Sequence, residues 1–203
     1  MAAHPERPLS ALDVIFMRRS VRSYERQRLD ESTIRALLDA AVQAPTALHM
    51  EPWAFVVVQD GGTLKRCSDR AKASWARQAD EHRDLHLIGE ATARSQFAAQ
   101  LADPDFSLFY DASTLIVICA KPMGPFVVAD CWLAAENLML AASAMGLGTC
   151  CIGSAVPALN APETKTELGI PADVTAVAPI IVGVPRGDAA PVSRRDPDIL
   201  CWR

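Results

Sequence analysis

The sequence has no excess of positive charge. Its 20 Lys and Arg residues are outnumbered by 24 Asp and Glu residues, which gives a net charge of −4 and a pI near 5.6. Proteins that bind nucleic acid usually carry a strong basic excess on the binding domain. The charge balance therefore argues against a nucleic-acid partner.

Long apolar runs are missing as well. No stretch reaches the roughly 18 uninterrupted apolar residues that a membrane span needs. The most apolar helical segment, 129–145, is interrupted by Asp130, Glu136 and Asn137. The first eight residues lack the basic start and apolar centre of a signal peptide. We expect a cytoplasmic protein with no membrane partner.

Paired cysteines and zinc motifs are also absent. None of the six cysteines stands in a CxxC pair, so we interpret most of them as small buried hydrophobes. Cys150 and Cys151 are neighbours, and a redox role stays open, although adjacent residues of an extended chain point to opposite faces. His82 and His86 are four residues apart but do not enclose the Glu of a zinc protease motif. We expect an exposed pair and no metal site.

What is present indicates one globular domain over residues 1–203. Half of the residues are hydrophobic and 22% are charged. Three apolar strands lack alternation and need cover on both faces, so the sequence predicts an α+β or α/β domain with about four strands. The stretch 61–109 is helical, polar and weakly periodic, and we interpret it as a helical lid or excursion. The pattern predicts strands at 53–58, before 120, at 149–153 and at 174–184, and helices at 9–18, 30–44, 125–145 and 162–168.

An arginine-rich motif follows the first expected helix. It reads Met17-Arg-Arg-Ser-Val-Arg-Ser-Tyr24. In an extended chain Arg18, Ser20 and Arg22 would point to one side, and guanidinium groups bind phosphate in a fork. The motif is compatible with a phosphate cradle, but a solvated basic stretch would have the same composition.

Three more segments have the character of binding loops. Residues 44–58 place His49 and Glu51 between a helix and a strand opened by Pro-Trp, and rigid flanks are where sites are often built. Residues 146–154 read Gly-Leu-Gly-Thr-Cys-Cys-Ile-Gly-Ser, a glycine-rich turn that matches no phosphate-loop motif. Arg194-Arg195-Asp-Pro197 stands in a tail that we expect to be extended.

Taken in order, these segments resemble the nitroreductase family of FMN-dependent enzymes. The resemblance covers most of the chain and includes the Asp-Ala-Ser strand that begins at Asp111 and ends in Ala-Lys at 120–121. It implies an α+β fold with a mixed sheet covered by helices. It also implies an intertwined homodimer with an FMN in each of two clefts at the interface.

The same resemblance assigns roles to residues. Arg18, Arg19 and Ser20 would hold the phosphate and ribityl end, Arg22 would lie near the pyrimidine side of the flavin, and Arg195 would return to the phosphate. The backbone at Ile152, Gly153 and Ser154 would cover the flavin edge that includes N5, and Pro45, Thr46 and His49 would come from the other subunit. A fixed cation near the pyrimidine would favour the reduced flavin. The cofactor carries the chemistry, so no catalytic side chain is expected.

Some positions depart from the family pattern. His49-x-Glu51-Pro-Trp is similar to the iodotyrosine deiodinase branch, but the chain has only two tyrosines, neither in the helical part of the lid. Asp105 and Leu108 stand where other members have a cofactor-binding Asn and Lys. The leading hypothesis is hydride transfer from NADH or NADPH to a small flat acceptor such as a nitroaromatic or quinone. The alternatives are a dehalogenase or flavin-consuming enzyme, and a flavin-binding protein without turnover.

Overall fold

The computed structural model describes residues 9–81 and 91–203. A four-stranded sheet forms its centre, with the order β1 (Trp53–Val58), β2 (Thr114–Ala120), β4 (Thr175–Gly183) and β3 (Gly148–Cys151). All three pairings between these strands are antiparallel. His82 and His86, expected to be an exposed pair, lie outside the described residues.

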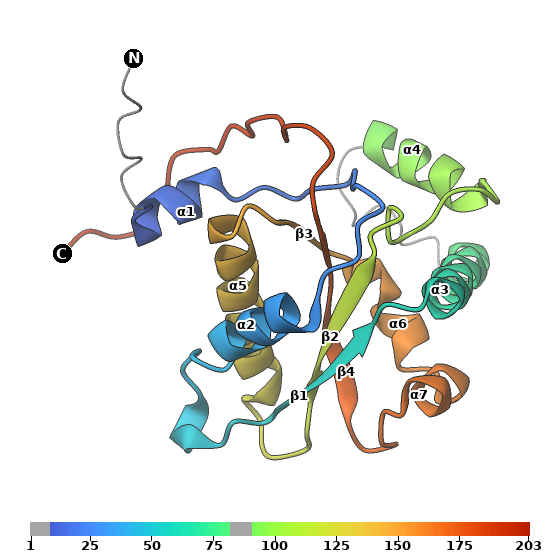
Figure 1. Ribbon diagram of the computed structural model, residues 1–203, viewed down its shortest axis with the longest axis horizontal. Coiled ribbons are helices and arrows are strands. Elements are labelled where there is room, and N and C mark those ends of the chain that lie inside the picture. The colour runs from blue at the N-terminus through green and yellow to red at the C-terminus, as the bar shows by residue number, and fades with distance from the viewer. Residues whose placement is uncertain (1–8, 82–90) are drawn as a thin grey trace.

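Helices cover both faces of the sheet (Figure 1). The helices α2 (Glu31–Ala41) and α5 (Val127–Ala144) pack on one face, where Ile116 and Ile180 join Leu138 in one core. On the other face, α3 (Gly61–Glu81), α6 (Val156–Leu159) and α7 (Pro162–Leu168) cover a second core that contains Val117 and Leu159. Every residue of β2 is buried. The cover on both faces that the apolar strands predicted is confirmed, as is the α+β class.

The helix α5 is, within the described residues, the one helix long and apolar enough to cross a membrane. Its inner face is fully buried against the sheet and α2 through small residues such as Cys131, Ala134 and Ala142. Its outer face carries Trp132 and Leu133, which are exposed in the single chain. The apolar composition is therefore that of a core helix whose outer face is exposed to solvent in the single chain.

Pro179 lies inside β4 without interrupting the strand. The strand runs on through Pro179, and its pairing with β2 shifts register between Ile118 and Cys119. Proline has no N–H to donate, so it occurs in sheets near edges or irregularities. Pro179 itself stays in register opposite Val117, and the extra residue of the bulge is Val177. Pro179 lies just past the last residue of β3 that pairs with β4, and its carbonyl accepts a hydrogen bond from the Ile152 N–H at 2.8 Å.

The arginine motif is attached to the free edge of β3. The helix α1 (Ala11–Met17) begins with a capping box of Ser10 and Asp13 and ends at Arg18, where the backbone becomes extended. The Val21 N–H then donates to the Thr149 carbonyl at 2.9 Å. Ser20 and Thr149 form an isolated parallel bridge, which is the parallel component of an otherwise antiparallel sheet.

Gly148 is required for this attachment. A Cβ atom at position 148 would lie 2.8 Å from three side-chain carbons of Val21, closer than real contacts allow. Gly148 therefore lets the N-terminal segment approach the sheet edge. The remaining elements are η1 (Ala47–His49), α4 (Ala91–Ala102) and η3 (Gly153–Ala155).

Substituting Gly148→Ala should destabilise the protein by about 1–3 kcal/mol, because overpacking displaces Val21 from the sheet edge. Denaturant unfolding measures the loss. Gly61→Ala is the matched control, because a Cβ there meets no atom within 4 Å. Adding Val21→Ala to Gly148→Ala should restore part of the stability. Equal stability of the two glycine variants would contradict the steric account.

Candidate functional site

A cleft lies between the arginine motif and the start of the C-terminal tail. We call it the arginine cleft, and its volume is about 610 Å³. In Figure 1 the red tail crosses the top of the molecule beside the blue segment that follows α1. Among the described residues, four arginines and a single carboxylate line it, so its potential is positive. These charged residues are Arg19, Arg22, Arg186, Arg194 and Asp188.

The arginines of the motif do not all face this cleft. Arg19, Ser20 and Arg22 line it, as expected of a common site. Arg18 instead reaches α5, with its Nε atom 3.3 Å from a carboxylate oxygen of Glu136. That Nε is buried and has no hydrogen-bond partner among the described residues. The Arg19 Nη1 donates to the carbonyls of Phe16 and Arg18, at 2.6 and 2.8 Å, which holds this guanidinium near the end of α1.

The tail contributes Arg194 to the cleft, in place of Arg195, which the resemblance named. Arg194 lines the cleft, whereas Arg195 is not among its lining residues. Arg186, directly after the last strand, was not singled out from the sequence. It forms an ion pair with Glu25 at 3.4 Å, and the Arg186 N–H donates to the Ser23 carbonyl at 2.9 Å. A basic residue next to Gly187 at a strand end was the only signal for it.

Residues 152–154, the last part of the glycine-rich segment, follow β3 directly, and we call them the glycine-rich turn. Ile152 is buried, Gly153 is exposed and Ser154 is half-buried. The structure thus brings the arginine motif and the glycine-rich turn together at β3. Ser20 pairs with Thr149 in this strand, and the turn begins at Ile152. Ser154 also receives a contact from the lid: the Trp75 indole N–H on α3 donates to its carbonyl at 2.8 Å.

Side chains of α3 contact α4 and the segment that follows it. Trp75 meets Phe97 of α4 edge to face, with ring centroids 5.7 Å apart. The Lys72 ammonium donates to the carbonyls of Asp103, Pro104 and Phe106 at 3.0, 3.3 and 2.8 Å. These bonds satisfy carbonyl groups just beyond the end of α4, where helix termini leave acceptors free. The two aromatic side chains therefore pack with each other, next to the glycine-rich turn.

Pro45, Thr46 and His49 lie far from the arginine cleft within one chain. They precede β1, at the opposite edge of the sheet from β3. The strand register also separates them. The loop leads into Trp53, which pairs with Ala120 and so lies level with Thr175 at the start of β4. The arginine motif pairs with Thr149, which lies opposite Val182 near the end of β4. A single chain does not bring this loop and the arginine motif together.

The same loop is strained. Leu48, His49 and Glu51 have φ values of 53°, 53° and 44°. Such left-handed conformations are costly for residues other than glycine and cluster at functional sites. No hydrogen bond joins the His49 and Glu51 side chains in the described part of the chain. The loop is held by the Ala47 N–H, which donates to the buried Asp130 at 3.3 Å, and by a longer bond of 3.5 Å from the Glu51 N–H to the Thr46 hydroxyl.

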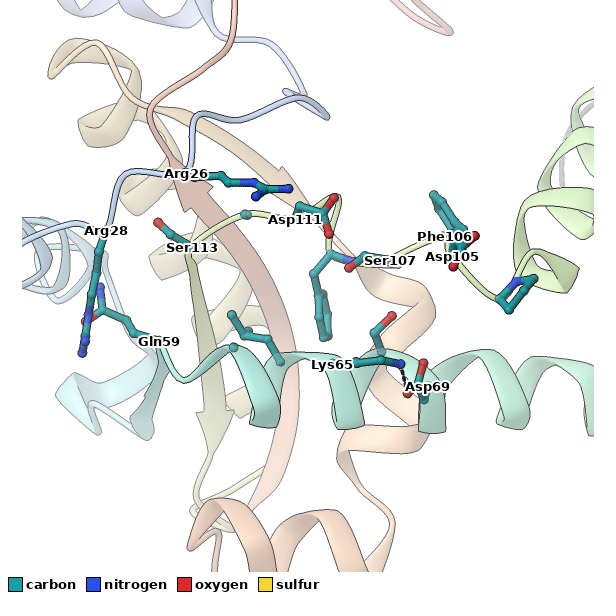
Figure 2. A pocket seen from close by; sticks show the side chains of 16 residues that line it. Arg26, Arg28, Gln59, Lys65, Asp69, Asp105, Phe106, Ser107, Asp111 and Ser113 are labelled. Atoms are coloured by element: carbon teal, nitrogen blue, oxygen red, sulfur yellow. Dashed lines mark hydrogen bonds and ion pairs between the residues drawn. The ribbon is translucent and has the colours of Figure 1, made fainter.

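A second hollow of about 520 Å³ lies between α3, the loop 104–113 and the segment at Arg26 and Arg28. Figure 2 shows its charged groups, several of which are already paired inside the protein. Lys65 and Asp69 form an ion pair at 2.7 Å, and the Arg28 Nε donates to Gln59 at 3.0 Å. The positive arginine cleft is the stronger candidate for an anionic ligand.

The two positions that depart from the family pattern have different fates. Leu108 is buried in the core, and its N–H donates to the Ser68 hydroxyl at 2.8 Å. Asp105 is exposed and lines the hollow of Figure 2. A smaller hollow of about 270 Å³ lies between the two, since it shares Asp105 with the hollow of Figure 2 and Arg22 with the arginine cleft, and Tyr110 also lines it.

The neighbouring cysteines are poor nucleophiles. Burial raises the pKa of Cys150, and burial followed by the charge of Cys150 raises the pKa of Cys151 to about 11. Reactive cysteines need a depressed pKa, because the thiolate is the reacting form. Both residues therefore remain thiols at neutral pH, as expected of structural cysteines.

Comparison with known proteins gives a consistent result. Residues 15–184 match the model of the nitroreductase family. The chain is 29% identical over 182 residues to a protein of Archaeoglobus fulgidus with the provisional name NADH dehydrogenase/NAD(P)H nitroreductase, a match that covers 87% of this chain and 86% of the relative. It is also 29% identical over 188 residues to the 5,6-dimethylbenzimidazole synthase of Rhodospirillum rubrum, with 86% and 82% covered.

Solved structures share the fold. The crystal structure of an FMN-bound nitroreductase from Bacteroides fragilis superimposes with a TM-score of 0.78 at 24% identity, covering 96% of this chain and all of that one. The likeness confirms the fold that the sequence motifs predicted.

The contact between Trp75 and Ser154 makes a prediction for the lid. Trp75→Phe should destabilise the protein by about 1 kcal/mol, since it leaves a carbonyl without its hydrogen bond. It should also reduce the hydrogen-exchange protection of α3. Phe97→Leu, which removes the ring contact but keeps the hydrogen bond, should leave the protection of α3 around Trp75 higher than in Trp75→Phe. Unchanged protection in Trp75→Phe would show that this bond does not attach the lid.

Proposed function

Since the chain belongs to the nitroreductase family, we propose that it is a cytoplasmic FMN-dependent oxidoreductase that uses NADH or NADPH to reduce a small flat acceptor such as a nitroaromatic or quinone. The observation that carries the proposal is the arginine cleft, which joins Arg19, Ser20 and Arg22 to Arg186 and Arg194. Bound FMN would supply the hydride chemistry.

The residues present fit the FMN group. A phosphate dianion is best bound by guanidinium groups and hydroxyls, which form short charge-assisted hydrogen bonds. Arg19 and Ser20, at the cleft, provide both. We assign the phosphate end to Arg19 and Ser20, with Arg194 returning from the tail. Arg18 and Arg195, which the resemblance placed at the phosphate, do not line the cleft, and Arg18 pairs with Glu136 instead.

The remaining residues are assigned to the flavin ring, because Arg22 and the turn at 152–154 both lie next to β3. Arg22 would lie at the pyrimidine side, where a fixed cation favours the negative charge of the reduced flavin. The backbone of Ile152, Gly153 and Ser154 would cover the edge with N5. This division leaves no step that needs a side-chain acid, base or nucleophile, and Cys150 and Cys151 stay protonated thiols.

A second subunit would complete the site. In one chain, Pro45, Thr46 and His49 stand at the opposite sheet edge from β3. The single chain also leaves large apolar side chains exposed in three places, and exposed apolar clusters mark interaction surfaces. They lie on α1, on the outer face of α5 and in the tail, and they include Leu12, Phe16, Trp132, Leu133, Leu200 and Trp202. We propose a homodimer in which the strained loop of one subunit faces the arginine cleft of the other.

The first experiment is an absorption spectrum of the purified protein, followed by anaerobic NADPH and then NADH. We expect a flavin band that one nicotinamide bleaches and a nitroaromatic or quinone restores. A band that neither nicotinamide bleaches would contradict the proposed electron donor. Loss of the flavin itself during aerobic reduction would favour the flavin-consuming alternative.

A binding experiment tests the phosphate assignment. Arg19→Gln should weaken FMN binding by about 10- to 100-fold, as expected for a hydrogen bond between charged groups. It should leave riboflavin binding nearly unchanged, because riboflavin has no phosphate. The matched control is Arg35→Gln on α2, where Arg35 pairs with Glu31 at the surface. An equal loss for both ligands would place Arg19 elsewhere than at the phosphate.

A further inference from the structure

Tyr110 lies under the guanidinium group of Arg22. The Arg22 Cζ atom is 5.9 Å from the centroid of the Tyr110 ring, a cation–π distance. Both residues line the smaller hollow, and Arg22 also lines the arginine cleft. Arg22 therefore lines both spaces, and the ring of Tyr110 lies against its guanidinium group.

The ring of Tyr110 is itself held. Phe106 meets it edge to face, with centroids 5.5 Å apart and an interplanar angle of 82°. The backbone around it is a turn in which the Tyr110 N–H donates to the Ser107 carbonyl at 2.9 Å. Leu108 and Phe109 anchor this turn in the core, where both are about 1% exposed. The ring thus has a rigid support, while Arg22 on its long side chain is exposed.

The turn stores backbone strain at this position. Tyr110 and Asp111 have φ values of 50° and 55°, in the left-handed region. Bulky residues rarely adopt such values, and the strain persists only where the surrounding structure determines the conformation. A tyrosine in an extended or helical conformation would direct its ring elsewhere. The strained turn therefore determines the direction of the ring.

We infer that Tyr110 is a positioning residue that holds the Arg22 guanidinium at the arginine cleft and so favours the reduced form of the bound flavin. The inference rests on the proposed function, in which Arg22 lies at the pyrimidine side. Other family members are expected to have a cofactor-binding Lys at the position of Leu108. Here Leu108 is uncharged and buried, so this turn supplies no cation to the cleft. The turn would instead fix a cation that another segment supplies.

The size of the effect follows from the interaction. A cation–π contact at an exposed site contributes about 0.5–1 kcal/mol. Without the ring, Arg22 would sample positions in solvent, and the reduced flavin would lose part of its stabilising charge. We expect Tyr110→Leu to lower the ratio of affinities for reduced over oxidised FMN by about three- to fivefold. For a two-electron couple this is a fall in midpoint potential of roughly 14–21 mV.

The test measures midpoint potentials of the FMN-loaded protein. Tyr110→Phe keeps a π face and should retain most of the wild-type potential, whereas Tyr110→Leu should not. In an Arg22→Gln background, Tyr110→Leu should cause no further change, because the ring acts through Arg22. Double-mutant cycles of this kind separate a coupled effect from a general one.

A second series covers the case in which Tyr110→Leu does not fold. Phenylalanine at position 110 is replaced by analogues with one, two and three ring fluorines, which weaken the π face and hardly change its size. The potential should fall stepwise along this series. Wild-type protein that binds no FMN would overturn the proposed function and this inference together. Bound FMN with equal potentials along the series, or a Tyr110→Leu effect that persists without Arg22, would overturn this inference alone.

Discussion

The structure depends on the docking of one extended segment at the free edge of β3. The Val21 N–H bonds to the Thr149 carbonyl, and the Val21 side chain lies against Gly148, where no larger residue fits. An unpaired strand edge offers a row of donors and acceptors for such an addition. This docking places Arg19, Ser20 and Arg22 beside the glycine-rich turn and opposite the tail. Without it, the arginines would be a basic stretch on the surface.

The sheet explains why the site lies at an edge. Two cores bury both faces of the strands, so no polar ligand can reach the centre of the sheet. Polar binding groups are therefore confined to segments that leave the sheet: the arginine motif, the turn after β3 and the loop before β1. The first two meet in one chain, and the third stands at the opposite edge. The strain in that loop and the exposed apolar side chains of α1 and α5 are the observations on which the proposed homodimer rests.

The lid and the turn after it have internal supports that composition does not reveal. Lys72 binds three carbonyls beyond α4, and Trp75 binds the carbonyl of Ser154. In the sequence these residues belong to a polar, weakly periodic stretch. Their roles depend on backbone acceptors 30 to 80 positions away, and the left-handed turn at Tyr110 depends on the packing of Leu108 and Phe109. No local pattern encodes such pairs.

The sequence by itself determined the α+β class, the positions of the main strands and the family. These follow from local properties: runs of β-branched residues, the capping box at Ser10, and motifs in a specific order. Spacing in an extended chain also predicted that Ser20 and Arg22 share one side, but it placed Arg18 with them, whereas Arg19 lines the cleft in the structure. Only the tertiary structure decided that Arg18 turns to Glu136, that Arg186 and Arg194 line the cleft, and that β4 continues through Pro179 beside the end of β3. Those outcomes depend on contacts between segments distant in the chain, where charge pairing and close packing, not local propensity, select the arrangement.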